Sequence, residues 1–272
     1  MSVAIVGCGY VGSALGATLV RRGLDVVGTT TSPGRVDELA SLGIQPVVLE
    51  VADVGALRSC VTGCGTLFLM VAPGGPDGDY RAVYLEGVGN LLVAAAGSSV
   101  RHIVLTSSTS VYGQDEGGWV DETCPTEPVR ENSRILLEAE RALLAGAKAQ
   151  GMTATVLRLS GIVGPGRLAG GRAARYAGQE RTDGEVYVNL IHRDDIVAAC
   201  VALLDRPCHG VLNLSGDAPI LRRRLYDRVI AAAGLEPIRW KSSGGASRGK
   251  RVANQRIKRE LGLTLAHGEP WR

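Results

Sequence analysis

Short apolar runs alternate with longer stretches of mixed apolar and polar residues over the first 157 positions of the chain. The apolar runs, beginning with SVAIVG at residues 2–7, have the length of buried strands, and the stretches between them, such as residues 13–22 and 80–96, have the spacing of helices. Strands that are apolar throughout and separated by helices are typical of a parallel sheet covered on both faces. The pattern therefore predicts an α/β fold with a doubly wound parallel sheet.

The alternation is looser after residue 157. Residues 165–187 are rich in glycine and arginine, and a loop of this length in a compact protein is often a lid or a binding loop. Residues 188–205 return to a strand followed by a helix, and residues 241–250 have the glycine and serine content of a linker. We therefore expect a mobile loop at 165–187 and a smaller second part of the chain.

The first apolar run leads directly into VGCGYVGSAL at residues 6–15, where Gly7, Gly9 and Gly12 have the spacing G-x-G-x-x-G. Between a strand and a helix, this spacing is typical of a dinucleotide-binding loop. The first glycine permits a tight turn, the second lets the backbone approach the pyrophosphate, and the third allows close packing of helix on strand. The helix N-terminus then offers N–H groups to the phosphates. The motif therefore predicts a dinucleotide site, with a vestigial loop as the alternative.

The end of the second predicted strand bears on the choice of cofactor. A carboxylate there would favour NAD, but the sequence has Thr30, Thr31 and Ser32, followed by Arg35. Hydroxyl groups and a guanidinium can accept a 2′-phosphate, which favours NADP over NAD; alternatively, Arg35 is only a solvated helix residue and the preference is weak. The complete set predicted to line the cofactor is Gly7, Gly9, Tyr10, Val11, Gly12, Thr30, Thr31, Ser32, Arg35, Val71, Ala72, Pro73 and Thr106.

Composition limits the other classes of function. Apolar residues make up 45% of the chain and charged residues 21%, which is typical of a globular protein. The net charge is only +3, and the basic clusters at 221–225 and 248–251 are short, so no nucleic-acid partner is expected. The six cysteines form no C-x-x-C motif and no histidines are paired at metal-binding spacing, which predicts reduced thiols and no metal site. Without a signal-peptide pattern or a membrane-length apolar run, we expect a cytoplasmic protein with no membrane partner.

Five further motifs follow in chain order: LTSSTSVYG (105–113), DETCPTEP (121–128), LLEAE (136–140), LRLSGIVGPG (157–166) and IHRDDI (191–196). They resemble those of the extended short-chain dehydrogenase/reductases of the NAD-dependent epimerase/dehydratase type, in particular the atypical subgroup. With the glycine motif, the resemblance covers nearly the whole chain. It implies a Rossmann domain, a small C-terminal substrate subdomain and a cleft between them. We therefore assign residues 1–157, completed by 188–205, to a Rossmann dinucleotide-binding domain, and residues 158–187 and 206–272 to the substrate-binding subdomain and its lid loop.

The resemblance also implies a catalytic set of Ser or Thr, Tyr and Lys, the last two spaced Y-x-x-x-K. Ser108 matches the serine, but alignment on LLEAE puts Arg130 and Arg134 at the Tyr and Lys positions, and the chain has no Y-x-x-x-K. Arginine does not release its proton at neutral pH, so it cannot replace the phenol. Arg134 can still bond the nicotinamide ribose, and Arg130 either clamps an anionic substrate or faces solvent. Tyr112 is the nearest phenol in sequence, either as the acid or base or as a packing residue.

The expected function is an NAD(P)-dependent oxidoreductase or epimerase/dehydratase-like enzyme that acts on a small polar metabolite without the usual Tyr and Lys. A homodimer is the assembly to look for. Two alternatives stay open: a non-catalytic protein that senses NADP(H), and a non-redox enzyme, such as a cyclase or lyase, that keeps the cofactor for structure.

Overall fold

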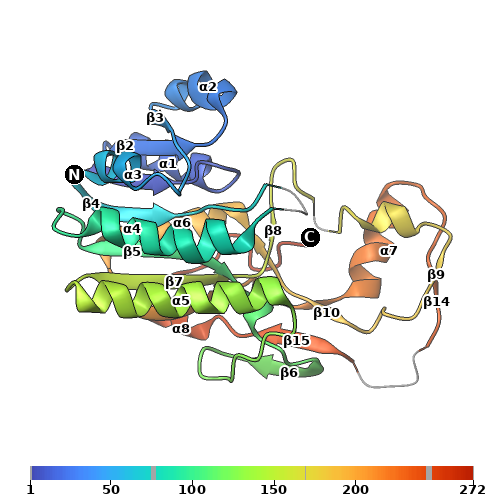
Figure 1. Cartoon of the computed structure of the whole chain (residues 1–272). Coiled ribbons are helices and arrows are strands. Elements are labelled where there is room, and N and C mark those ends of the chain that lie inside the picture. The colour runs from blue at the N-terminus through green and yellow to red at the C-terminus, as the bar shows by residue number, and fades with distance from the viewer. Residues whose placement is uncertain (1, 75–77, 169, 243–246, 272) are drawn as a thin grey trace. The chain divides into compact units, whose positions relative to one another are not determined.

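The computed structural model in Figure 1 describes residues 2–74, 78–168, 170–242 and 247–271, so residue 169 of the predicted loop and 243–246 of the predicted linker lie outside the described residues. The chain forms two compact units. The first comprises Met1–Val111, Pro128–Arg158 and Val197–Leu212, and the second comprises Tyr112–Glu127, Leu159–Ile196 and Asn213–Arg272. The boundaries of these units differ from those of the predicted domains. The assignment of one domain to the dinucleotide and the other to the substrate stays a prediction.

The first unit is built on a seven-stranded sheet with the order β12-β7-β5-β4-β1-β2-β3. Its strands are β1 (Ser2–Val6), β2 (Asp25–Thr30), β3 (Gln45–Val48), β4 (Cys64–Leu69), β5 (His102–Ser108), β7 (Thr153–Leu159) and β12 (Gly210–Leu214). The pairs β1–β2, β1–β4, β2–β3 and β4–β5 are parallel. The chain thus winds outward from β1 in both directions, which confirms the predicted doubly wound α/β fold.

Helices cover both faces of this sheet. They are α1 (Gly12–Arg21), η1 (Pro33–Arg35), α2 (Val36–Ser41), α3 (Val54–Val61), the π-helix η2 (Arg81–Glu86), α4 (Gly87–Ala95), η3 (Thr109–Val111), α5 (Glu131–Ala149) and most of α6 (Arg193–Asp205). Ala4 and Val6 of β1 belong to the core shared with α3, α4 and α5. Ile5 points to the opposite face, where a Cβ on Gly12 or Gly16 of α1 would lie 3.3 or 3.5 Å from its side chain. Figure 1 shows α4 and α5, in green, side by side along their face.

The second unit contains short strands in two-stranded pairs. Its elements are β6 (Glu116–Val120), β8 (Gly161–Val163), η4 (Ala173–Tyr176), β9 (Glu180–Arg181), β10 (Tyr187–Val188), β11 (Leu190–His192), β13 (Ile220–Leu221), α7 (Arg222–Ala232), β14 (Arg239–Trp240), β15 (Gly249–Val252) and α8 (Gln255–Leu261). β15 pairs with β6, β11 with β8 and β14 with β9 in parallel, and β10 pairs with β13 antiparallel. Among the described residues, no helix has the length and apolar character needed to cross a membrane.

The predicted loop at 165–187 contains η4 and β9. Tyr176 of η4 stacks on Tyr226 of α7, with ring centroids 5.9 Å apart and an interplanar angle of 11°. Ala173 is fully buried in a core with Ile230 and Ile238. The η4 turn of the loop is therefore packed on α7. The mobility of the loop as a whole stays a prediction.

A buried ion pair joins the carboxyl end of β5 to α5 and β7. The Glu140 carboxylate accepts two bonds from Nε and one from Nη2 of Arg158, at 3.1–3.2 Å and 2.7 Å. It also accepts a bond of 2.5 Å from the Ser107 hydroxyl. The Arg158 and Glu140 side chains are only 6% and 2% exposed. Because both charged side chains are shielded from water, each serves as the counter-ion of the other. The hydrogen bond from Ser107 ties the end of β5 to this ion pair.

Removing the Glu140 charge should strongly destabilise the first unit. Glu140→Gln would leave the Arg158 guanidinium buried without its counter-ion, which costs about 3–5 kcal/mol of the free energy of unfolding. Glu131→Gln, which breaks the exposed pair with Arg134 on the same helix, should cost less than about 1 kcal/mol. Urea denaturation of both variants measures the difference, and equal losses would contradict a structural role for the buried pair.

Candidate functional site

The turn between β1 and α1 requires two of its glycines. Gly7 has φ of +100°, which L side chains rarely adopt, and a Cβ there would lie 2.7 Å from the carbonyl oxygen of Met70. A Cβ on Gly12 would collide with the carbonyl oxygen of Gly7. The chain can therefore turn against the end of β4 and pack α1 on β1 only with glycine at both positions.

Gly9, unlike Gly7 and Gly12, borders open space. A Cβ on Gly9 would meet no atom within 4 Å, and the residue is exposed at the N-terminal end of α1. Below it, the loop is held to β2, because the N–H of Gly7 donates to Thr29 Oγ1 at 3.0 Å and that of Cys8 to the Thr29 carbonyl at 2.7 Å. A fixed backbone that borders open space at a helix N-terminus fits the pyrophosphate of a dinucleotide.

Cys8 lies inside this loop without adding a charge to it. Its side chain is buried, and burial raises the pKa of the thiol to about 12, although the nearby Arg35 lowers it. The thiol is therefore neutral at physiological pH and does not repel a phosphate.

Thr30, Thr31, Ser32 and Arg35 lie at and just after the end of β2, where the Glu38 carboxylate, not predicted from the motif, joins them. Thr30 Oγ1 accepts the N–H of Ser32 at 3.1 Å, while Thr31 and Ser32 are exposed. The Arg35 guanidinium donates to the Cys8 carbonyl at 2.5 Å. Its Nε and Nη2 atoms also donate to Glu38 at 3.0 and 2.7 Å.

The pair between Arg35 and Glu38 occupies the edge of the guanidinium that a phosphate would use. The hydrogen bond from Arg35 lowers the pKa of Glu38, so its carboxylate is ionised at neutral pH. The two side chains are 31% and 54% exposed, which leaves both able to rearrange in solvent. A 2′-phosphate that binds Arg35 must therefore compete with the Glu38 carboxylate.

Four other predicted cofactor residues lie in or after β4 and β5 of the same sheet. Val71, Ala72 and Pro73 come just after β4, and Ala72 is exposed. Thr106 of β5 donates its hydroxyl to the carbonyl of Leu69 on β4 at 3.3 Å. Because these strands are parallel, their carboxyl ends share one edge of the sheet with the glycine loop, which is where ligands bind in doubly wound folds.

Ser108 ends β5, and its hydroxyl accepts the N–H of Ser110 at 3.1 Å. Ser110 also accepts a bond of 3.0 Å from Ser133, a buried residue in the first turn of α5. The site residues predicted around the start of α5 are Arg130 and Arg134, and Ser133 was not among them. The hydroxyl groups of Ser110 and Ser133 thus meet just after the end of β5.

The two arginines lie on the exposed side of the start of α5. Arg130 precedes the first helical residue and is exposed. Arg134 is 55% exposed and pairs with Glu131 at 3.3 Å. Their predicted roles in binding the substrate and the ribose stay predictions.

Tyr112 belongs to the second unit and is only 2% exposed. Its phenol donates to Asn213 Oδ1 at 2.9 Å, and its carbonyl accepts Lys250 Nζ at 2.8 Å. Burial lowers the pKa of Lys250. The phenol is therefore bonded inside the unit, and an acid or base role would require it to leave Asn213.

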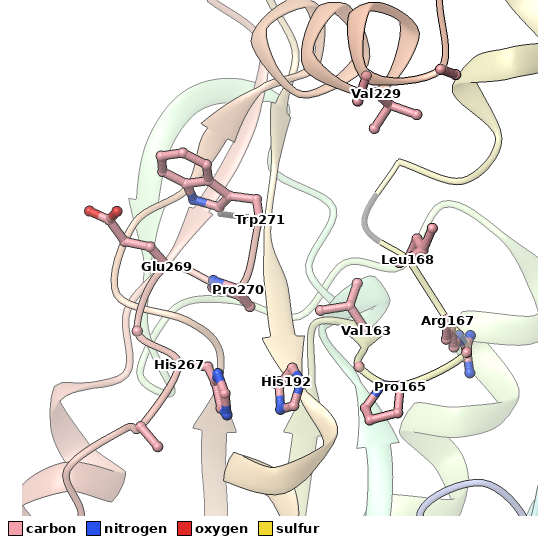
Figure 2. A pocket seen from close by; sticks show the side chains of 16 residues that line it. Val163, Pro165, Arg167, Leu168, His192, Val229, His267, Glu269, Pro270 and Trp271 are labelled. Carbon is pink, nitrogen blue, oxygen red and sulfur yellow. The ribbon is translucent and has the colours of Figure 1, made fainter.

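The second unit contains an open cleft of about 1050 Å³. Figure 2 shows that it is lined by the segment after β8, by α7 and by the last residues of the chain. Its lining includes the polar residues Arg167, His192, His267 and Glu269 and the apolar residues Val163, Val229 and Trp271. Such a mixture suits a small molecule with both polar and apolar parts.

One family model and the two relatives named below each match most of this chain. The model of the NAD dependent epimerase/dehydratase family matches residues 3–214. Protein YeeZ of Escherichia coli is 34% identical and aligns over 98% of this chain and 97% of its own. The 3 beta-hydroxysteroid dehydrogenase/Delta 5→4-isomerase of Mycobacterium tuberculosis is 31% identical over 97% of this chain and 78% of that protein.

A solved structure has the same fold. It is a short-chain dehydrogenase/reductase superfamily protein of Agrobacterium tumefaciens with bound NAD, 24% identical, with a TM-score of 0.82 over 97% of this chain and 92% of the other.

A charge placed on Gly9 should abolish dinucleotide binding. Gly9→Asp would put a carboxylate into the open space over the helix N-terminus, where it would crowd and repel the pyrophosphate. The fold should survive, because no atom lies within 4 Å of the new Cβ. Gly89→Asp is the matched control, since Gly89 is an exposed glycine of α4 with equally open surroundings. Calorimetric titration with NADH and NADPH tests this, and unchanged affinity in Gly9→Asp would refute the assigned loop.

Proposed function

Since the chain belongs to the NAD-dependent epimerase/dehydratase family, we propose that it is a dinucleotide-dependent oxidoreductase or epimerase acting on a small polar metabolite. The observation that carries the proposal is the glycine loop, in which Gly7 and Gly12 fix the backbone while Gly9 borders open space. The relative from Mycobacterium tuberculosis is a dehydrogenase by name, which supports redox chemistry.

The chain's own groups would bind the cofactor, orient the substrate and stabilise the reacting oxygen. When bound, a nicotinamide cofactor supplies or accepts a hydride. The N–H groups at the start of α1 hold the negative charge of its pyrophosphate. The Ser108 hydroxyl, at the carboxyl end of β5, donates a hydrogen bond to the oxygen of the reacting carbonyl or alcohol.

The proposal includes a preference for NADP over NAD. Its support is the turn after β2, where Thr31 and Ser32 are exposed and Arg35 is partly exposed, in a turn without a carboxylate at the strand end. Glu38 limits this preference, because its ionised carboxylate holds Arg35 and would lie near the 2′-phosphate.

Variants at Arg35 and Glu38 should change affinity for NADP and leave affinity for NAD nearly unchanged. Arg35→Ala removes a charged hydrogen bond to the 2′-phosphate and should cost about 1–3 kcal/mol in NADP binding. Glu38→Gln releases the guanidinium and removes a repelling charge, so NADP should bind several-fold more tightly. Calorimetry with both dinucleotides provides the measurement. Tighter binding of NAD than NADP by the unmodified protein would contradict the preference.

Ser108→Ala should lower turnover by about 10²-fold or more, with little change in cofactor affinity, because the reacting oxygen loses its donor. A panel of small polar carbonyl compounds, followed through the absorbance of the reduced nicotinamide, identifies a substrate for this assay. Ser110→Ala is the neighbouring control. Turnover of Ser108→Ala at the level of the unmodified protein would refute the role of Ser108.

Tyr112→Phe separates the two interpretations of the buried phenol. Loss of its bond to Asn213 should lower the free energy of unfolding by about 1–3 kcal/mol, with turnover of the folded protein reduced less than tenfold. A 10²-fold loss of turnover without loss of stability would instead identify Tyr112 as the acid or base.

A protein that binds dinucleotides but transfers no hydride to any carbonyl compound would contradict the enzyme proposal and favour a sensor.

A further inference from the structure

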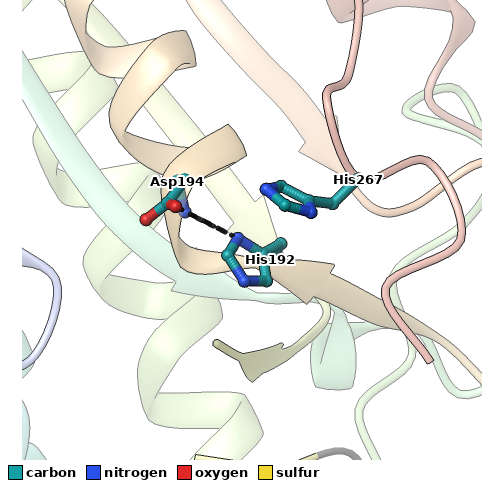
Figure 3. Close-up of side chains that lie close together, drawn as sticks. All are labelled: His192, Asp194 and His267. Atoms are coloured by element: carbon teal, nitrogen blue, oxygen red, sulfur yellow. Dashed lines mark hydrogen bonds and ion pairs between the residues drawn. The ribbon is translucent and has the colours of Figure 1, made fainter. Parts of the chain in front are cut away.

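Two histidines and a carboxylate meet in the second unit. His192 ends β11, Asp194 is in the first turn of α6, and His267 comes from the segment after α8. The two imidazole centroids are 3.8 Å apart, with the rings tilted by 31°. The Asp194 Oδ2 atom is 3.7 Å from Nδ1 of His192. Figure 3 shows the carboxylate and the His267 ring beside the His192 ring, and one potential ligand atom from each residue lies within 4.8 Å of the others.

Hydrogen bonds hold these residues in place. Asp195 is 1% exposed, and its two carboxylate oxygens accept the backbone N–H groups of Ala266 at 2.7 Å and His267 at 3.1 Å. The N–H of Asp194 approaches Nδ1 of His192 at 3.2 Å and orients that ring. β11 itself is paired with β8. The chain therefore fixes His267 next to the start of α6 through Asp195, which is not itself part of the cluster.

We propose that His192, Asp194 and His267 bind one divalent transition-metal ion, with Zn²⁺ as the expected ion. Two imidazoles and one carboxylate form a donor set that Zn²⁺ and its neighbours in the first row accept. Ligands about 2.1 Å from a tetrahedral ion are about 3.4 Å apart. One potential ligand atom from each of the three residues lies within 4.8 Å of the others, about an ångström beyond this spacing. Small rotations of the exposed Asp194 and His267 side chains would complete the geometry.

The bound ion would have a coordination position beyond its three protein ligands. Three protein ligands and one exchangeable position are typical of catalytic rather than structural zinc sites. His192 and His267 both line the cleft, so a water molecule or the oxygen of an anionic molecule in the cleft can take this position. The site belongs to the second unit alone and does not depend on dinucleotide binding.

The sequence predicted no metal site, because the two histidines are far apart in the chain and neither belongs to a recognised ligand spacing. Long-range contacts bring them together, among them the bonds that the Asp195 carboxylate accepts from the N–H groups of residues 266 and 267.

Metal titration of the full chain tests the site. The protein is treated with a chelator, dialysed, and titrated with Zn²⁺ by calorimetry and with Co²⁺ by visible absorption. We expect one ion per chain with micromolar or tighter affinity, and a Co²⁺ spectrum typical of mixed nitrogen and oxygen ligands. His267→Ala and Asp194→Asn should each weaken binding by about tenfold or more. His209→Ala, which removes an exposed histidine outside the cluster, should bind as the unmodified protein does.

Two results would overturn the proposal: failure of the unmodified protein to bind Zn²⁺ or Co²⁺ at micromolar concentrations, and equal affinity in the His267→Ala and unmodified proteins. The thermal midpoint of each variant without metal shows whether it is folded. If His267→Ala is not folded, His267→Gln replaces it, because its side chain keeps a polar group without the imidazole.

Discussion

The close contact of the glycine turn with the end of β4 is the constraint on which the rest of the first unit depends. Gly7 approaches the Met70 backbone so closely that no side chain fits, and Gly12 does the same against Gly7. These contacts place α1 directly on β1 and direct its N-terminus to the edge where β4 and β5 also end. A larger residue at either position would move the helix, and with it the N–H groups that are expected to hold the pyrophosphate.

A second constraint acts on the same edge from inside the unit. The buried pair of Glu140 and Arg158 ties α5 to β7, and the bond from Ser107 adds the end of β5. Ser108 follows immediately and is the last residue of β5, so its backbone is set by the strand and by the bond that its neighbour Ser107 makes to Glu140. The second unit relies on similar buried carboxylate bonds, since Asp195 holds the segment that carries His267. In both units, a residue proposed to act on a ligand, Ser108 in the first and His267 in the second, lies beside a buried polar side chain that holds the local backbone in place.

The sequence predicted those features that depend on local pattern. The strand, turn and helix around Gly9 were predicted from the apolar run and the glycine spacing that follows it, and the apolar runs correctly indicated the doubly wound sheet. Pairings between distant segments were not predicted, because they leave no pattern in the local sequence. Examples are the pairing of β15 with β6 and the hydrogen bond from Tyr112 to Asn213. Glu38 was missed for a different reason, since its competition for Arg35 depends on the side-chain geometry of one helical turn.

A crystal structure of the full chain grown with NADPH would show whether the glycine loop holds a dinucleotide. Density for the pyrophosphate is expected over the backbone of residues 9–12, with the adenosine ribose near the end of β2. A dinucleotide bound elsewhere, or an empty loop at saturating concentration, would contradict it.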